Sequence, residues 1–168
     1  MTVAELDGYF RRIMAIDEIG SADASLNGLQ VGRSDAEVRR AAFAVDACME
    51  TFRRSAERGA QLLFVHHGLF WGKPVAVTGE HYERLRFLIE QGISLYASHL
   101  PLDMQPEFGN NAGIAKQLEL VRAEPFGDYH GISIGIKGRL PKAMSLDAVL
   151  DRIGLDRSTA LGVLPFGP

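Results

Sequence analysis

The chain has little that would tie it to an oxidising compartment or to a membrane. Cys48 is the only cysteine among 168 residues, which rules out an internal disulfide and favours a reducing compartment. No apolar run reaches the roughly 18 residues that a membrane-spanning helix needs, and the first residues lack the basic stretch of a signal peptide. We therefore expect a cytoplasmic protein with no membrane partner.

Positive charge is scarce as well. Lysine and arginine number 18 against 21 acidic residues, for a net charge of -3, whereas nucleic-acid binders normally carry a basic surplus. This balance argues against nucleic acid as a partner. Apolar residues at 46% and charged residues at 23% are typical of a folded globular chain. The length fits one domain spanning residues 1–168, and no linker is visible.

Continuous apolar stretches alternate with helical patterns between residues 41 and 98. The stretches at 41–45, 62–65 and 93–98 are typical of strands buried on both faces of a parallel sheet. Helices are predicted between them, one from Cys48 to Arg58 with Asp46 as its cap, and one starting at residue 78 or 79. This order predicts an α/β fold, with a largely parallel sheet and flanking helices.

Local signals predict the remaining elements. Thr2 and Glu5 have the spacing of a capping box, which begins a helix that continues to Met14. Residues 132–137 alternate between apolar and polar, so they predict an edge strand or an antiparallel strand. We further expect a turn at 27–32, a helix capped by Asn110 or Asn111, a helix from Ser145 to Gly154, and a strand-like run at 159–164.

Metal-capable side chains follow two of the predicted strands. His66 and His67 come directly after residues 62–65, and Asp103 follows the strand at 93–98. The carboxyl ends of parallel strands meet at one edge of the sheet, where ligands bind in open α/β folds. We predict a metal centre with His66, His67 and Asp103 as ligands, in which Asp103 bridges two ions. His99 would lie just outside the coordination sphere and orient Asp103 or a bound water.

These donors favour some ions over others. Imidazole and carboxylate suit zinc, iron or manganese better than calcium or magnesium. A simpler interpretation stays open, with both histidines neutral and hydrogen-bonded to backbone and Asp103 in a turn. His81, expected to be solvated on a helix, and His130 are weaker candidates. The sequence has no serine elbow and no phosphate-binding glycine loop, so it identifies no catalytic residue and no organic cofactor site.

Several motifs together resemble one family. They are Asn27-Gly28-Leu29-Gln30-Val31-Gly32, Val45-Asp46-Ala47, Val65-His66-His67-Gly68-Leu69-Phe70-Trp71, and Ser98-His99-Leu100-Pro101-Leu102-Asp103 followed by Gly109-Asn110-Asn111. Each motif alone is weak, but in this order they are similar to the Nif-three-like proteins, also called GTP cyclohydrolase type 2 homologues. The resemblance covers nearly the whole chain.

The resemblance implies a fold, an assembly and a metal centre. The expected assembly is a homo-oligomer, a hexameric ring built as a trimer of dimers, with a dinuclear centre of two divalent ions per subunit. His66, His67 and Asp103 match the family's metal ligands from its amino-terminal half. Family members add a further His and Glu from a second half, which these residues do not contain. We therefore expect this chain to bind at most one ion tightly and to turn over substrate poorly.

The resemblance also suggests an activity. It implies a metal-dependent hydrolase of nucleotide-like substrates, either a GTP cyclohydrolase or a phosphoesterase. Whether the chain is an enzyme stays open, because a non-enzymatic metal-binding oligomer, serving as a scaffold or a regulatory partner, would need the same ligands. A structural half-domain with vestigial ligands is a third interpretation.

Overall fold

The computed structural model describes residues 1–155 and 162 and divides the chain into two compact units. The first unit is Met1–Leu102 and the second begins at Asp103, with the boundary inside a short helix, α5 (Leu100–Met104). The run predicted at 159–164 lies, apart from Gly162, outside the described residues. Within the described part of the chain, no helix has the length and apolar character needed to cross a membrane.

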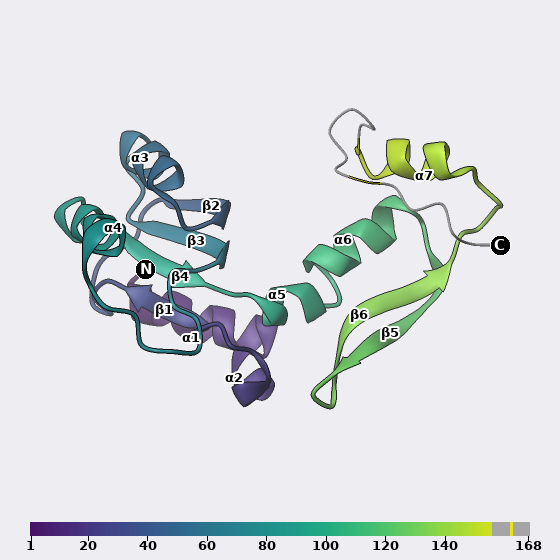
Figure 1. Cartoon of the computed structure of the whole chain (residues 1–168), viewed down its shortest axis with the longest axis horizontal. Helices are drawn as coiled ribbons and strands as arrows, with labels where there is room; N and C mark the ends of the chain where they lie inside the picture. Colours follow the sequence, from purple (N-terminus) through teal and green to yellow (C-terminus); the bar gives the residue numbers. More distant parts are fainter. Residues whose placement is uncertain (156–161, 163–168) are drawn as a thin grey trace. The chain divides into compact units, whose positions relative to one another are not determined.

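The first unit is built on a four-stranded sheet with the order β1-β4-β3-β2 (Figure 1). Three strands are parallel, as predicted, and β1 pairs antiparallel with β4 at one edge. The connecting helices confirm the predicted α/β fold and its largely parallel sheet. The elements are β1 (Gly28–Val31), β2 (Ala41–Asp46), α3 (Met49–Glu57), β3 (Leu62–His67), α4 (Gly79–Glu90) and β4 (Ser94–Ala97).

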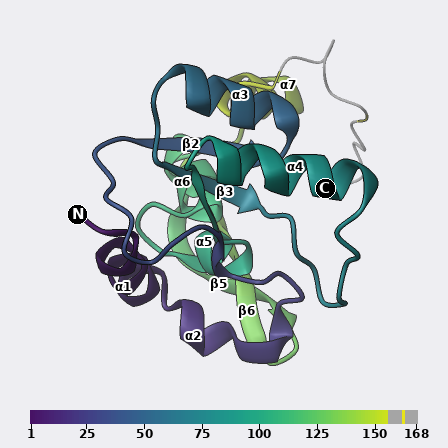
Figure 2. The same ribbon diagram turned by 90° about the vertical axis from the view of Figure 1, so that its left-hand side faces the viewer.

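Helices cover both faces of this sheet. Figure 2 shows α3 and α4 on one face and α1 (Val3–Met14) on the other. Alternate residues of β3 divide between the two cores: Leu63 and Val65 pack toward α3 and α4, and Leu62 and Phe64 toward α1. The central strand is therefore apolar from Leu62 to Val65, where both of its faces are buried. After α1 the chain forms α2 (Ile16–Ile19) and a 3-10 turn, η1 (Gly20–Ala22).

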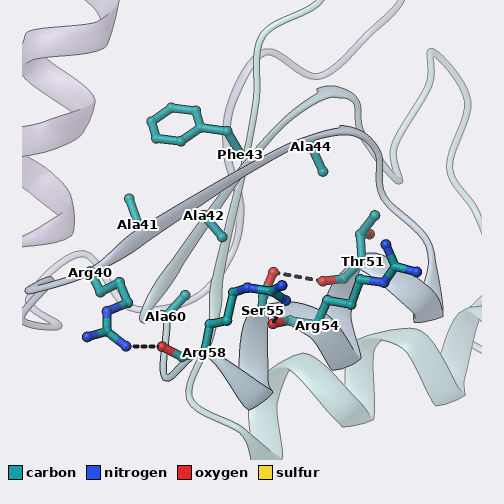
Figure 3. Close-up of a pocket in the computed structure, with 10 residues that line it drawn as sticks. All are labelled: Arg40, Ala41, Ala42, Phe43, Ala44, Thr51, Arg54, Ser55, Arg58 and Ala60. Carbon is teal, nitrogen blue, oxygen red and sulfur yellow. Dashed lines mark hydrogen bonds between the residues drawn. The ribbon is translucent and has the colours of Figure 1, made fainter.

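The expectation that residues 41–45 are buried on both faces is wrong. They form β2, which pairs only with β3 among the described strands and is the edge of the sheet. Ala42 and Ala44 pack toward α3, and Phe43 points away from it (Figure 3). Phe43 and Val45 are 71% and 60% exposed. Because β2 is the edge strand and no described helix covers Phe43 and Val45, an apolar sequence lies at the surface.

The predicted turn at 27–32 is also wrong, because four of these residues form the strand β1. Two glycines allow β1 to pair with β4. Gly28 and Gly32 have φ of 109° and 129°, which other residues rarely adopt. A Cβ on Gly32 would lie 2.9 Å from the Ser94 Cα, so only glycine permits this approach to β4.

The predicted helix caps were partly confirmed. The Thr2–Glu5 capping box and the Ser145 cap are present. The helix α3 begins after Cys48 and not after Asp46, whose carboxylate contacts His67 instead. Likewise α6 (Asn110–Gln117) is capped by Gly109 rather than by an asparagine. In both places the polar side chain expected to cap has a tertiary partner instead: Asn110 donates to Asp103, and Asn111 donates to the Ile134 carbonyl.

The second unit contains α6, an antiparallel hairpin and α7 (Leu146–Arg152). The hairpin joins β5 (Val121–Tyr129) to β6 (Ile132–Arg139), which confirms the antiparallel strand predicted at 132–137. His130 and Gly131 form its turn, both with positive φ, as a two-residue hairpin loop requires. The strand β5 was not predicted, because Pro125 and Gly127 interrupt its pattern.

Candidate metal centre

The two adjacent histidines are the last residues of β3. Val65 pairs with Ala97 of β4, so His67 and His99 each lie two residues beyond that pair, at the same edge of the sheet. Asp46 ends β2 and pairs with His67. Three parallel strands therefore bring polar side chains to their common carboxyl edge, which is the placement that the sequence predicted for His66 and His67.

At this edge the rings of His66, His67 and His99 converge. The centroids of the His66 ring and the His67 ring are 4.4 Å apart, and His99 lies 4.9 Å from His66 and 5.7 Å from His67. One ligand nitrogen from each residue lies within 4.8 Å of the others. Neighbouring residues inside a strand point to opposite faces, but the strand ends here, and both rings reach the same place.

Each of the three rings has a hydrogen-bond partner at Nδ1. His66 donates to the Ser98 carbonyl at 3.1 Å, and His67 contacts the Asp46 carboxylate at 2.7 Å. His99 contacts the Asp23 carboxylate at 2.9 Å. A neutral imidazole that donates from Nδ1 carries its lone pair on Nε2, the arrangement common among metal-bound histidines. The three residues could therefore hold a divalent ion, and in this tautomer Nε2 is the nitrogen that binds it.

Asp23 is the most buried charged group near the cluster, with its side chain only 2% exposed. It accepts hydrogen bonds from the Ser25 and Leu100 backbone N–H groups, the Asn27 amide and the His99 ring. Burial by itself raises the pKa of the Asp23 carboxyl, but the hydrogen bonds from Asn27, His99, Ser25 and Leu100 outweigh it, and the pKa is lowered. Asp23 is therefore a buried carboxylate.

An indole ring borders the cluster. Trp71 lies edge-on to His99, with ring centroids 4.8 Å apart, and its Nε1–H donates to the Gly68 carbonyl at 2.9 Å. It is 38% exposed, so part of the ring lies at the surface beside the histidines. The cluster thus combines three nitrogen donors, two carboxylates behind them and one aromatic ring.

Asp103, the third predicted ligand, belongs to the second unit, where it accepts a hydrogen bond from the Asn110 amide at 2.9 Å. Its role as a ligand, and that of His66 and His67, stays a prediction. The structure places His99 directly beside the two histidines, where it could itself hold an ion. His130 is exposed in the hairpin turn.

The sequence does not identify two residues of the site, Asp46 and Asp23, and it predicts the wrong surroundings for His81, which is not part of the cluster. Asp46 was interpreted as a helix cap, although its place at the end of a strand parallel to β3 was a usable signal. Asp23 lies in a loop 76 residues from His99, and no local pattern marks it. His81 was expected to be solvated, which is wrong: its ring packs edge-on against Phe70 at 5.2 Å and its Nε2 is buried.

Comparison with known proteins gives one consistent family. A family model described as Duf34/NIF3 (NGG1p interacting factor 3) matches residues 1–163. Two curated relatives carry the name GTP cyclohydrolase 1 type 2 homolog. The one from Deinococcus radiodurans is 53% identical over 78% of this chain, and the one from Archaeoglobus fulgidus is 41% identical over 99%.

Solved structures agree with this match. TTHA1606 from Thermus thermophilus is 44% identical with a TM-score of 0.79, covering 92% of this chain and 60% of its own. Reduced HcgD from Methanocaldococcus jannaschii is 27% identical with a TM-score of 0.75, covering 90% of this chain and 58% of its own. The chain spans 49% of the Deinococcus relative and 65% of the Archaeoglobus relative.

Proposed function

The chain belongs to the Duf34/NIF3 family, and from this premise we propose that its histidine cluster is the metal centre of a metal-dependent hydrolase of nucleotide-like substrates. The observation that carries the proposal is the convergence of His66, His67 and His99, with one ligand nitrogen of each within 4.8 Å of the others. The Nδ1 hydrogen bonds support it, since a neutral ring that donates from Nδ1 carries on Nε2 the lone pair that binds an ion.

Zinc, iron and manganese are the ions that this donor set suits, because imidazole nitrogen dominates it. When bound, such an ion lowers the pKa of a water and supplies hydroxide near neutral pH. The residues of this chain would hold the ion and orient its ligands. The histidines would hold the ion, and the carboxylate of Asp46 would orient the ring of His67. Asp103 stays a ligand expected from its match to the family motif alone.

The name shared by the relatives, GTP cyclohydrolase 1 type 2 homolog, favours a purine nucleotide as the substrate class. The partly exposed Trp71 beside His99 supports this choice, because an indole face can stack on a base. Water attacking a ring carbon of the purine would open the imidazole ring, as a cyclohydrolase does. Attack at phosphorus would make the protein a phosphoesterase.

A second candidate function is a metal-binding homo-oligomer without turnover. It is favoured by the exposed apolar side chains of the edge strand β2, Phe43 and Val45, because exposed apolar surface commonly marks an interface. The hexameric ring of the family resemblance would provide such an interface. In this alternative the metal stabilises a scaffold or a regulatory partner.

Metal content and turnover test the proposal together. We expect the purified chain to retain zinc or manganese after dialysis, and the variants His66→Ala and His67→Ala to lose it. His130→Ala is the matched control, since His130 lies in the exposed hairpin turn. Hydrolysis of a nucleotide in a panel, lost in the same variants, supports the enzyme. Metal retention without turnover favours the scaffold, and metal content equal in all variants contradicts the proposed centre.

A further inference from the structure

We propose that Asp23 and Asn27 are positioning residues that fix His99 as an Nε2 ligand of the histidine cluster. The inference rests on the proposed metal centre and deepens it, because it assigns a ligand role to His99 and a reason for that role. Its basis is a set of hydrogen bonds between residues 23–27, here called the 23–27 loop, and the segment that follows β4.

The 23–27 loop holds both the backbone and the ring of His99. The Asn27 Oδ1 accepts the His99 backbone N–H at 2.7 Å, and the Asp23 Oδ2 accepts the Leu100 backbone N–H at 3.0 Å. The other oxygen of Asp23 accepts Nδ1–H of the His99 ring at 2.9 Å. With the backbone and Nδ1 both held, the orientation of the ring and the position of Nε2 are determined before any ion binds.

The two positioning side chains are themselves held in place. Asn27 donates from Nδ2 to Asp23 at 2.8 Å, and the Ser25 backbone N–H donates to Asp23 at 2.9 Å. Asp23 therefore receives donors on both of its oxygens and has little freedom to rotate. A carboxylate held in this way keeps its contact with the His99 ring.

The same loop is also tied to the segment that follows His66 and His67. The Leu26 N–H donates to the Phe70 carbonyl at 3.0 Å, and the Gly72 N–H donates to the Ala24 carbonyl at 2.6 Å. Ser25 and Trp71 form an isolated antiparallel bridge. The 23–27 loop thus joins the two chain segments that supply the histidines, which sets His99 at its distance from the other two rings.

Nuclear magnetic resonance tests the positioning without any metal. Long-range 15N–1H correlations of the metal-free chain at about pH 8.5, above the ordinary histidine pKa of about 6.5, report which ring nitrogen carries the proton. We expect His99 to be protonated at Nδ1, and Asp23→Asn to shift part of the population to the other tautomer. Protonation of the wild-type His99 ring at Nε2 would overturn the inference, whatever the variants do.

Zinc affinity tests the ligand role. Asp23→Asn and Asn27→Ala should each weaken Zn²⁺ binding about 10–100-fold, the usual effect of removing a partner behind a metal ligand. The matched control is Asp35→Asn, since Asp35 is exposed and pairs with Arg33. Asp23→Asn should add nothing to His99→Ala in a double variant, because its effect acts through His99. Amide spectra confirm that each variant is folded.

The outcomes separate this inference from the proposed function. If the wild type binds none of Zn²⁺, Fe²⁺ and Mn²⁺, the proposed centre is wrong, and the ligand role of His99 is wrong with it. If the wild type binds Zn²⁺ with the same affinity as folded Asp23→Asn and Asn27→Ala, the centre stands and the inference alone is overturned. Additive losses in the Asp23→Asn/His99→Ala double variant would likewise overturn it, because Asp23 would then act by another route.

Discussion

The two aspartate–histidine pairs of the cluster have similar lengths but different surroundings. Asp23 and His99 are 2.9 Å apart with the Asp23 side chain 2% exposed, whereas Asp46 and His67 are 2.7 Å apart with Asp46 63% exposed. Water and salt weaken an exposed pair, while burial makes a pair costly to break. The same contact therefore holds one ring firmly and the other loosely. Metal binding would be expected to order the His67 side more than the His99 side.

The largest expected effect comes from breaking the buried pair. Asp23→Ala leaves the His99 ring, the Asn27 amide and two backbone N–H groups without the acceptor they now share. We expect the free energy of unfolding to fall by roughly 3 kcal/mol, as for other buried hydrogen-bonded charges. Urea denaturation of the metal-free chain measures this change. A loss below about 1 kcal/mol would mean that water replaces the carboxylate.

Low pH should remove the stabilisation that the Asp23 carboxylate provides. The pKa of Asp23 is lowered in the folded state, so its stabilising contribution is complete above the unfolded pKa of about 3.9. That contribution is lost as the pH falls through the folded pKa. The difference in unfolding free energy between the wild type and Asp23→Asn should therefore shrink below about pH 4. Denaturation curves at several pH values test this, and a difference unchanged down to about pH 2 would contradict it.

Breaking the exposed pair should cost much less. Asp46→Ala removes a solvated carboxylate from His67, and an exposed contact of this kind contributes no more than an exposed ion pair, about 0.2–1 kcal/mol. We expect a loss of unfolding free energy in that range, measured in parallel with Asp23→Ala. A loss equal to that of Asp23→Ala would show that burial does not distinguish the two pairs.

The smallest expected effect is that of salt on the stability cost of each substitution, and it should differ between the exposed pair and the buried pair. At about 1 M sodium chloride the screening length is near 3 Å, so the cost of Asp46→Ala should fall toward zero. The cost of Asp23→Ala should change little, since the buried carboxylate is shielded from ions. Repeating both denaturation series at low and high salt makes the comparison. Equal salt sensitivity in the two variants would refute it.

Much of the fold could be predicted because its signals are local. A parallel strand buried on both faces has a continuous apolar sequence, so β3 and β4 were recognised, and the connecting helices followed from their spacing. The placement of His66 and His67 needed only the rule that parallel strands end at one edge. The capping box of Thr2 and Glu5 and the cap of Ser145 were correct because each involves residues three apart.

Elements whose character depends on a distant neighbour were harder to predict. The exposure of Phe43 follows from the place of β2 at the sheet edge, which its apolar sequence does not reveal. The strand β1 is short and contains glycine, and only its pairing with β4 makes it a strand. Asp46 was mistaken for a cap because its partner, His67, is 21 residues away.

The sequence by itself determined the family, the parallel α/β sheet and the edge at which two histidines lie, because each depends on short motifs and on the periods of helix and strand. Only the tertiary structure decided that His99 joins those histidines and that Asp23 stands behind it. No periodic pattern or local motif in the sequence predicts a hydrogen bond between residues 76 positions apart. It exists because the sheet and the 23–27 loop bring the two segments together, and burial then makes the contact costly to lose.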